Sequence, residues 1–193
     1  KIDLDGYLRQ GKIKEIMAFV LGGDGLNYGN LPKALLIFHQ YADKSRTALE
    51  EHFVEAAGYA RSCGDICRLH FTVSEEFQKA VVRHAGCVID EYRQQHRTRF
   101  QVDFSIQKPS TNTLAVDLGN RPFRNDRNRL VFRPAGHGAL LDNLNELDAD
   151  LIFIKNIDNV SHDRLLPEAI PYKKALAGCI LTLKKQIFGY LEV

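Results

Sequence analysis

Glycines and a lysine that could bind phosphate follow an early apolar run of this chain. Gly22 and Gly23 come directly after the run at residues 16–21, and Lys33 lies further along the same polar segment. Glycines permit tight turns and leave backbone N–H groups free to approach phosphate oxygens, and a lysine adds a compact positive charge. We interpret the segment as a phosphate-binding loop. The alternative is a mobile connection that binds nothing.

A second group of polar residues lies between residues 133 and 141. Gly136 and Gly138 flank His137 where a helix is expected to begin, and Arg133 precedes them. The start of a helix attracts anions because its first N–H groups are unpaired, and His137 offers a hydrogen bond to a base or sugar. These features favour a nucleotide contact. The alternative is that the glycines serve only the backbone and His137 is solvated.

A third candidate is Asp158, which directly follows an expected strand at residues 150–155. A carboxylate there suits Mg²⁺, which takes one or two protein carboxylates together with substrate phosphates. The alternative is an Asx turn that closes the strand without any metal.

The elements that must position these residues follow from apolar periodicity and capping. Continuous apolar runs at residues 16–21 and 150–155 predict buried strands. Thr47 and Glu50 match a capping box ahead of a helix, and Pro171 suits the first turn of a long helix that continues through residues 173–188. Further strands are expected at residues 67–73, 99–106, 114–118 and 130–132, and further helices at residues 74–97 and 137–147.

This alternation of strands and helices predicts a single α/β domain over residues 1–193. We expect three layers, with a mostly parallel sheet covered by helices on both faces. Open sheets of this kind bind ligands beyond the carboxyl ends of their strands, which is where all three polar groups lie.

Composition and charge exclude several classes of protein. With 45% apolar and 26% charged residues the chain is globular rather than disordered, and no apolar run is long enough to cross a bilayer. Its 26 Lys and Arg against 24 Asp and Glu argue against a general affinity for nucleic acid. The four cysteines include no CxxC pair and no export signal opens the chain, so we expect free thiols and a cytoplasmic location.

Other sites are less favoured. A zinc site from Cys63, Cys67 and His70, with His84 and Cys87 nearby, matches no common ligand spacing, and on a strand Cys67 and His70 would point to opposite faces. The arginines at 121–133 favour a solvated turn over phosphate or nucleic-acid contact. The sequence contains neither a Gly-x-Ser-x-Gly elbow nor a Walker loop, which argues against a serine hydrolase and a P-loop enzyme.

Taken together, the three groups resemble sugar-1-phosphate nucleotidyltransferases. Gly-Gly-Asp-Gly at 22–25 and Leu-Pro-Lys at 31–33 are similar to the loop that opens these enzymes. Phe104 and Gln107 resemble a strand end of the uridylyltransferase branch, Gly-His-Gly at 136–138 its nucleotide contact, and Ile-Asp-Asn at 157–159 its metal aspartate. Over most of the chain, the segments at 29–33, 133–141 and 155–160 look more like a bacterial family with a domain of unknown function.

The resemblance implies a nucleotide-diphospho-sugar transferase fold and Mg²⁺-dependent transfer of a nucleotidyl group from a nucleoside triphosphate to a sugar-1-phosphate. It implies that Lys33, and with it Arg133, neutralises phosphate charge and that Asp158 holds Mg²⁺. It assigns nucleotide contacts to the remaining candidates, which are Gly22, Gly23, Gln107, Gly136, His137 and Gly138.

One departure from the resemblance concerns activity. The first loop of the superfamily carries an arginine after its glycines, where this chain has Leu26 and Asn27. We therefore expect an Arg-bearing loop further toward the N-terminus and regard residues 1–193 as an internal fragment of a longer protein. The competing hypothesis is a non-catalytic module that binds a nucleotide or sugar.

Overall fold

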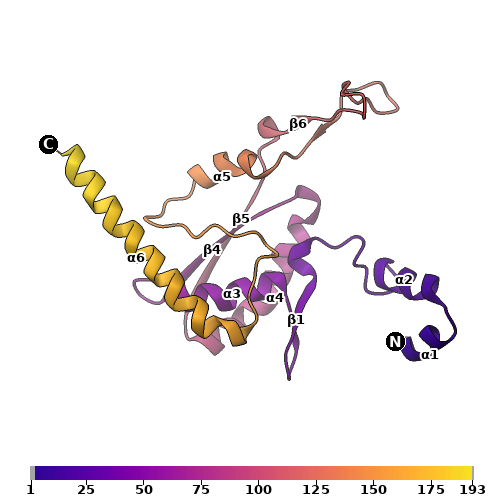
Figure 1. The fold of residues 1–193 in the computed structure, drawn as a ribbon, viewed down its shortest axis with the longest axis horizontal. Coiled ribbons are helices and arrows are strands. Elements are labelled where there is room, and N and C mark those ends of the chain that lie inside the picture. The colour runs from indigo at the N-terminus through magenta and orange to yellow at the C-terminus, as the bar shows by residue number, and fades with distance from the viewer. Residues whose placement is uncertain (1–2, 193) are drawn as a thin grey trace.

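A computed structural model describes residues 3–192 as a mixed α/β structure with three small, separate sheets (Figure 1). The sheets hold two, three and two strands, and only the pair β4–β5 is parallel. The predicted α/β class is therefore correct, but the predicted three-layer, mostly parallel sheet is wrong for the described residues. The strands are β1 (Ile37–Gln40), β2 (Ser45–Thr47), β3 (Arg61–Ser62), β4 (Ile66–Val73), β5 (Arg99–Ile106), β6 (Thr113–Leu114) and β7 (Phe132–Arg133).

The helices surround these sheets unevenly. They are α1 (Leu4–Arg9), α2 (Ile13–Leu21), α3 (Ala48–Tyr59), α4 (Glu75–His96), α5 (Leu141–Asn145) and α6 (Leu166–Leu191), with 3-10 turns η1 (Lys33–Leu35), η2 (Pro109–Thr111), η3 (His137–Leu140) and η4 (Asp163–Leu165). Among residues 3–192, no helix is long and apolar enough to cross a membrane.

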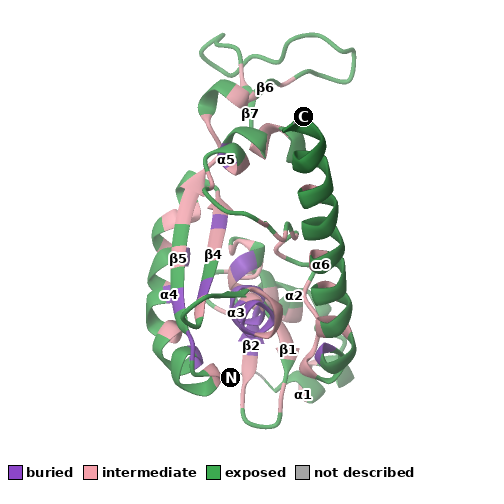
Figure 2. Ribbon diagram, turned by 90° about the vertical axis from the view of Figure 1, so that its left-hand side faces the viewer, coloured by how far each residue is buried: buried purple, intermediate pink, exposed green. Residues whose placement is uncertain are grey.

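The core lies between α3, α4 and the parallel pair β4–β5. Phe53 of α3 is fully buried and stacks on Tyr92 of α4, with ring centroids 5.7 Å apart, and makes a T-shaped contact with Phe100 of β5, with centroids 5.0 Å apart. Figure 2 shows the buried residues concentrated on α3, with further buried residues on the neighbouring strands. The other face of β4–β5 carries mostly polar side chains, which do not favour packing of a helix layer: Arg68 and Gln101 are both exposed there and hydrogen-bond to each other.

The start of α3 confirms the predicted capping box. The Thr47 hydroxyl accepts a hydrogen bond from the Glu50 N–H, and the Glu50 carboxylate accepts one from the Thr47 N–H at 2.8 Å. Both residues are buried, so these bonds satisfy donors that water does not reach.

The capping residue Glu50 should make the folding stability of the protein sensitive to acid. Burial alone would raise the pKa of Glu50, but hydrogen bonds with His84, Thr47 and Tyr92 lower it to about 2. A carboxyl with a lowered folded-state pKa stabilises the protein above its unfolded pKa of 4.5, and this contribution disappears as the pH falls toward 2. We expect Glu50→Gln to flatten the loss of unfolding free energy between pH 5 and 2, about the range that the lowered pKa spans, as measured by urea titration. An equally steep loss in both proteins would contradict this assignment.

Residues 16–21 form the end of helix α2 rather than the predicted strand. Six apolar residues fit either element, and the preceding Ile13, Lys14 and Glu15 extend the helix to nine residues. The helix buries no residue, and together with α1 it projects from the body in Figure 1. The prediction that Gly22 and Gly23 follow a buried strand is therefore wrong, because they follow an exposed helix.

Residues 150–155, the second predicted buried strand, form no strand among the described residues. Phe153 packs against Tyr59 of α3 with ring centroids 4.8 Å apart, but Ile154 is 72% exposed. A strand requires a neighbour that pairs with its backbone, and the structure shows no ladder for this segment.

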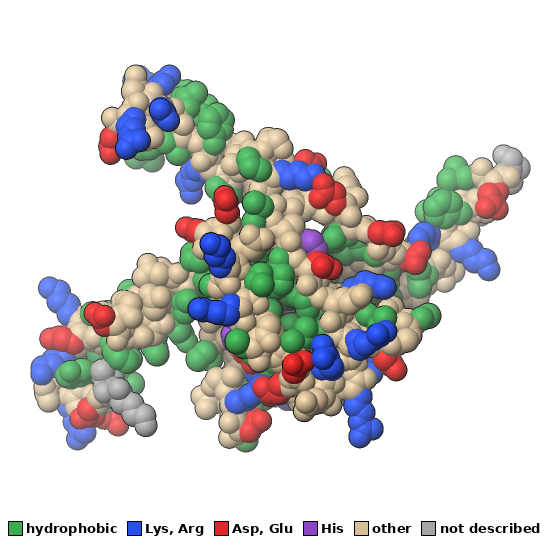
Figure 3. Space-filling model, turned by 180° about the vertical axis from the view of Figure 1, so that it is seen from behind, with side chains coloured by type: hydrophobic (Ala, Val, Ile, Leu, Met, Phe, Trp, Pro, Cys, Tyr) green, Lys and Arg blue, Asp and Glu red, His purple; other side chains and the backbone are tan. Residues whose placement is uncertain are grey.

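The remaining predictions hold in part. Residues 113–133 form an arm in which β6 pairs with β7 over two residues each, shorter than the strands expected there. The helix expected at 137–147 is divided into η3 and α5. Helix α6 begins at Leu166, so Pro167 lies in its first turn and Pro171 falls inside it. Figure 3 shows the arm, the end of α6 and the α1–α2 pair as three projections from a central body.

Candidate functional site

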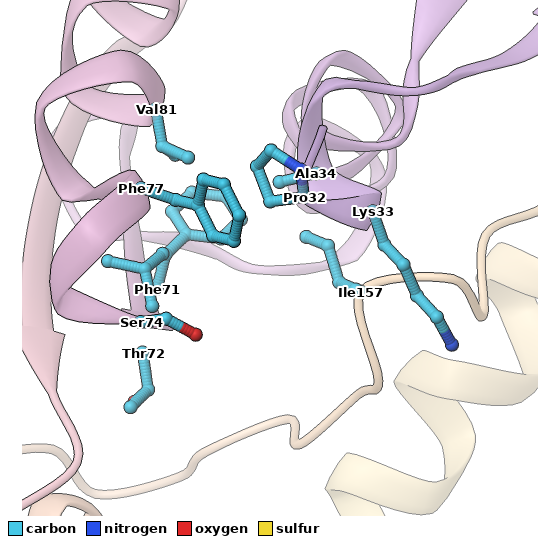
Figure 4. A pocket seen from close by; sticks show the side chains of 10 residues that line it. Pro32, Lys33, Ala34, Phe71, Thr72, Ser74, Phe77, Val81 and Ile157 are labelled. Atoms are coloured by element: carbon cyan, nitrogen blue, oxygen red, sulfur yellow. The ribbon is translucent and has the colours of Figure 1, made fainter. Parts of the chain in front are cut away.

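A small pocket opens at the carboxyl end of the parallel pair. Strand β4 ends at Val73 and Ser74 leads into α4, so the pocket lies where the parallel strand meets the following helix. It has a volume of about 140 Å³ and is bounded by η1, the end of β4, the first turns of α4 and Ile157. Figure 4 shows its apolar side chains facing one another and Lys33 running past Ile157 at the rim.

Lys33 and Asp158 meet at this rim. The ammonium Nζ of Lys33 donates to Oδ2 of Asp158 at 2.5 Å across 125 residues of sequence, and the side chains are 64% and 36% exposed. This hydrogen bond holds the pKa of Asp158 below its ordinary value, so the group is a carboxylate at neutral pH. The structure thus brings together the two residues to which the sequence assigned phosphate and metal roles.

Both partners are fixed by their local backbone. Lys33 begins η1, where the next residue, Ala34, is buried in the core. Asp158 lies in a turn closed by a hydrogen bond from the Asn159 N–H to the Asn156 carbonyl at 3.0 Å. The Ile157 carbonyl lies 3.1 Å from the imidazole Nε2 of His52 on α3, which anchors this turn to the core.

His137 approaches the same turn from η3. Its Nε2 lies 2.9 Å from Oδ1 of Asn156, two residues before Asp158. Gly136 and Gly138 flank it in open space, since a Cβ at either position would meet no atom within 4 Å. In this structure neither glycine is required by a close backbone contact.

Gln107 lies just beyond the end of β5. Its side-chain Nε2 donates to Oδ1 of Asn112 at 3.2 Å, and the side-chain amide of Asn143 on α5 donates to the Ile106 carbonyl at 2.8 Å. The end of β5 is therefore held by side-chain amides, and Gln107 reaches only its own loop.

Besides Gln107, three predicted site residues are not brought to this rim. Arg133 lies exposed on β7 in the projecting arm, and Gly22 and Gly23 lie at the end of the projecting α2 (Figure 1). An ion pair with phosphate bound near Lys33 would require the arm or the α1–α2 pair to change position.

Sequence reasoning missed a hydroxyl–imidazole cluster on the polar face of β4–β5. Nε2 of His70 lies 2.8 Å from Oγ of Ser105, which also receives a hydrogen bond from the Asn143 amide at 3.0 Å. Polar residues alternating along both strands carried the signal, but only the register of β4 with β5 shows which of them meet. Cys67, by contrast, is buried on the opposite face from His70, so the two cannot share a metal.

The donor set at the rim suits a weakly held divalent cation. Asp158 offers a single carboxylate, and across residues 3–192 no group of three or more His, Cys, Asp or Glu side chains is placed to hold a metal ion. Mg²⁺ accepts this arrangement, because it keeps several waters and takes its other ligands from substrate phosphates.

Comparison with known proteins gives one match. The family model described as domain of unknown function (DUF4301) matches residues 1–193. No curated protein and no solved structure matches the chain.

Proposed function

The chain belongs to the DUF4301 family, whose description assigns no activity, and we propose that it is a Mg²⁺-dependent nucleotidyltransferase domain acting on a nucleoside triphosphate and a sugar-1-phosphate. The observation that carries the proposal is the Lys33–Asp158 pair at the carboxyl end of β4–β5. A cation for phosphate and a carboxylate for a metal stand together at the edge where parallel α/β sheets bind ligands.

The fold supports the proposal through one unit. Strand β4, helix α4 and strand β5 form a parallel crossover whose strands pair along eight residues each. This is the repeating unit of nucleotide-binding α/β folds, and we propose that the complete protein has the nucleotide-diphospho-sugar transferase fold.

The transfer needs positioning and charge stabilisation more than covalent help from the protein. An oxygen of the sugar-1-phosphate attacks the α-phosphorus, the bond from that phosphorus to the bridging oxygen breaks, and pyrophosphate leaves with the electron pair. Lys33 stabilises the negative charge that develops on the transferring phosphate. Asp158 would hold Mg²⁺, which when bound supplies Lewis-acid neutralisation of the phosphates.

In the absence of ligands, Lys33 and Asp158 neutralise each other's charge. A triphosphate competes with Asp158 for the ammonium, and a divalent cation competes with Lys33 for the carboxylate. His137 and the flanking Gly136 and Gly138 are proposed to contact the nucleotide, and Gln107 its base edge. Arg133, Gly22 and Gly23 are proposed as further phosphate contacts if their projecting segments close over the rim.

A second candidate function is a non-catalytic module that binds a nucleotide or sugar. The observation that favours it is the placement of the arginines: Leu26 and Asn27 stand where the superfamily carries an arginine, and Arg133 lies on β7 in the projecting arm, away from Lys33 (Figure 1). Such a module would bind a uridine nucleotide but would not exchange pyrophosphate.

Binding of a uridine nucleotide with Mg²⁺ should raise the melting temperature. A ligand at a hundredfold excess over its Kd stabilises the folded state by about 2.7 kcal/mol, which corresponds to roughly 5–10 °C for a chain of this size. Asp158→Asn should remove the Mg²⁺-dependent part of the shift, whereas Asp126→Asn in the exposed arm should keep it. Differential scanning fluorimetry with uridine, adenine and guanine nucleotides tests this.

Each outcome of that panel has a distinct meaning. A shift with purine nucleotides alone would refute the uridine assignment. No shift with any nucleotide would overturn the proposed function. Equal Mg²⁺ dependence in the wild type and Asp158→Asn would leave Asp158 as a turn residue only.

A further inference from the structure

Both outer edges of the central parallel pair are open over most of their length among residues 3–192, since no strand lies beyond β5 and only the short β3 lies beyond β4. Strand β4 pairs with β5 along its whole length, but on its other edge β3 reaches only Ile66 and Cys67. From Arg68 to Val73 that edge meets no strand among residues 3–192. Unpaired N–H and C=O groups in a row are a template for another strand.

The segment at residues 151–155 is a second unpaired stretch, and it lies against the same helix. Phe153 packs on Tyr59, and Lys155 forms a buried ion pair with Glu55, both on α3. Strand β4 also rests on α3, because the Cys67 thiol donates to the Ala56 carbonyl and Phe71 packs edge-on against His52. Helix α3 therefore packs against both β4 and this segment.

The two stretches run in the same direction along α3. Phe153 meets the helix at Tyr59, and Ile157 meets it at His52. Seven helical residues span about 10 Å, and four nearly extended residues span about 13 Å, so the segment follows an almost straight course. Strand β4 likewise passes from Ala56 to His52, so both stretches end at the pocket that Lys33 and Ile157 border.

The accessible surface area of the chain is larger than expected for its mass, which indicates that surfaces buried in the complete protein are exposed here. Its accessible area is 14030 Å² for a mass of 21.9 kDa. A folded monomer of this mass exposes about 9,300 Å². Large apolar side chains are among the exposed residues, with Ile152 and Ile154 on the segment itself 38% and 72% exposed.

We infer that a further β-strand, supplied by the same polypeptide from outside residues 1–193, inserts between β4 and residues 151–155, parallel to both. A strand buried in a parallel sheet is connected to its neighbours by crossovers of one chain, which favours the same polypeptide over a separate partner. The strand is apolar on the side that faces α3. It turns residues 151–155 into the strand that their apolar run predicts.

The insertion also places new backbone at the Lys33–Asp158 rim. A parallel strand between these neighbours has its carboxyl end at the pocket, so the loop that follows it lies beside Lys33 and Asp158. The structural inference does not depend on the proposed function, since the pairing of the strand is measured without any nucleotide.

Hydrogen–deuterium exchange on the complete protein, as expressed from its gene, tests the inference. Amides of residues 151–154 and of the open edge of β4 should exchange at least about a hundredfold more slowly than the same sequences in unstructured peptides, because ladder pairing makes exchange depend on opening of the sheet. Amides within the β4–β5 ladder serve as the protected reference. Exchange of residues 151–154 within about threefold of the peptide rates would overturn the inference.

Dilution identifies the source of the strand. Protection that is unchanged over a hundredfold dilution supports a strand of the same polypeptide. Protection that disappears on dilution shows that a separate chain provides it and overturns the inference as stated.

Discussion

Lys33→Ala in the complete protein is expected to lower kcat/KM for pyrophosphate exchange by about 10²–10³-fold, or roughly 3–4 kcal/mol of transition-state stabilisation. The physical reason is that charge builds up on the transferring phosphate, and Lys33 is the cation that the fold places beside Asp158. Because the lysine is 64% exposed, its pairing with Asp158 adds little to folding stability. The effect should therefore appear in steady-state kinetics and not in the melting temperature.

Two variants control this experiment. Lys33→Arg should restore only part of the rate, because a planar guanidinium does not place its charge where the ammonium did. Lys79→Ala, at an exposed lysine of α4, should leave the rate unchanged. A Lys33→Ala enzyme within about threefold of wild type would reject the phosphate role of Lys33 and much of the case for a transferase.

Arg46→Met is expected to destabilise the fold by about 3–5 kcal/mol. Arg46 is 4% exposed, and its Nη1 donates to Asp163 at 2.7 Å and lies 3.5 Å from the carboxylate of Glu51. Glu51 is fully buried and also accepts a hydrogen bond from the Tyr41 hydroxyl at 2.8 Å. Removing the guanidinium leaves that carboxylate without its buried cation, while methionine keeps most of the volume.

Urea unfolding at neutral pH measures this loss. Arg93→Met is the matched control, because Arg93 forms an exposed ion pair with Asp90 on α4 and such pairs contribute about 0–1 kcal/mol. A loss below about 1 kcal/mol for Arg46→Met would show that Glu51 is neutralised without Arg46.

Interactions between residues that are close in the sequence could be predicted from it. The capping box of Thr47 and Glu50 needs only four consecutive residues, and the structure forms it as expected. The helix at 75–96 and its parallel neighbours β4 and β5 were likewise visible from periodicity. The run at residues 16–21 was misassigned because six apolar residues carry no period that separates a strand from a helix.

Features that depend on distant partners could not be read in this way. Residues 151–155 have the composition of a buried strand, but a strand exists only beside another one, and the described residues provide none. The pairing of Lys33 with Asp158 spans 125 residues, and that of Arg46 with Asp163 spans 117. The sequence indicated which side chains could do phosphate chemistry, whereas the course of the chain around α3 decided which of them meet.

The four cysteines differ in how accessible their thiols are to an alkylating reagent. Cys63, Cys87 and Cys179 are exposed, while Cys67 is buried in β4 and donates to the Ala56 carbonyl of α3. Burial also raises the pKa of the Cys67 thiol, so little of the reactive thiolate is present. An alkylating reagent first blocks the three accessible thiols. The slower rate at which it then labels Cys67 reports how often α3 separates from β4 and exposes the core between them.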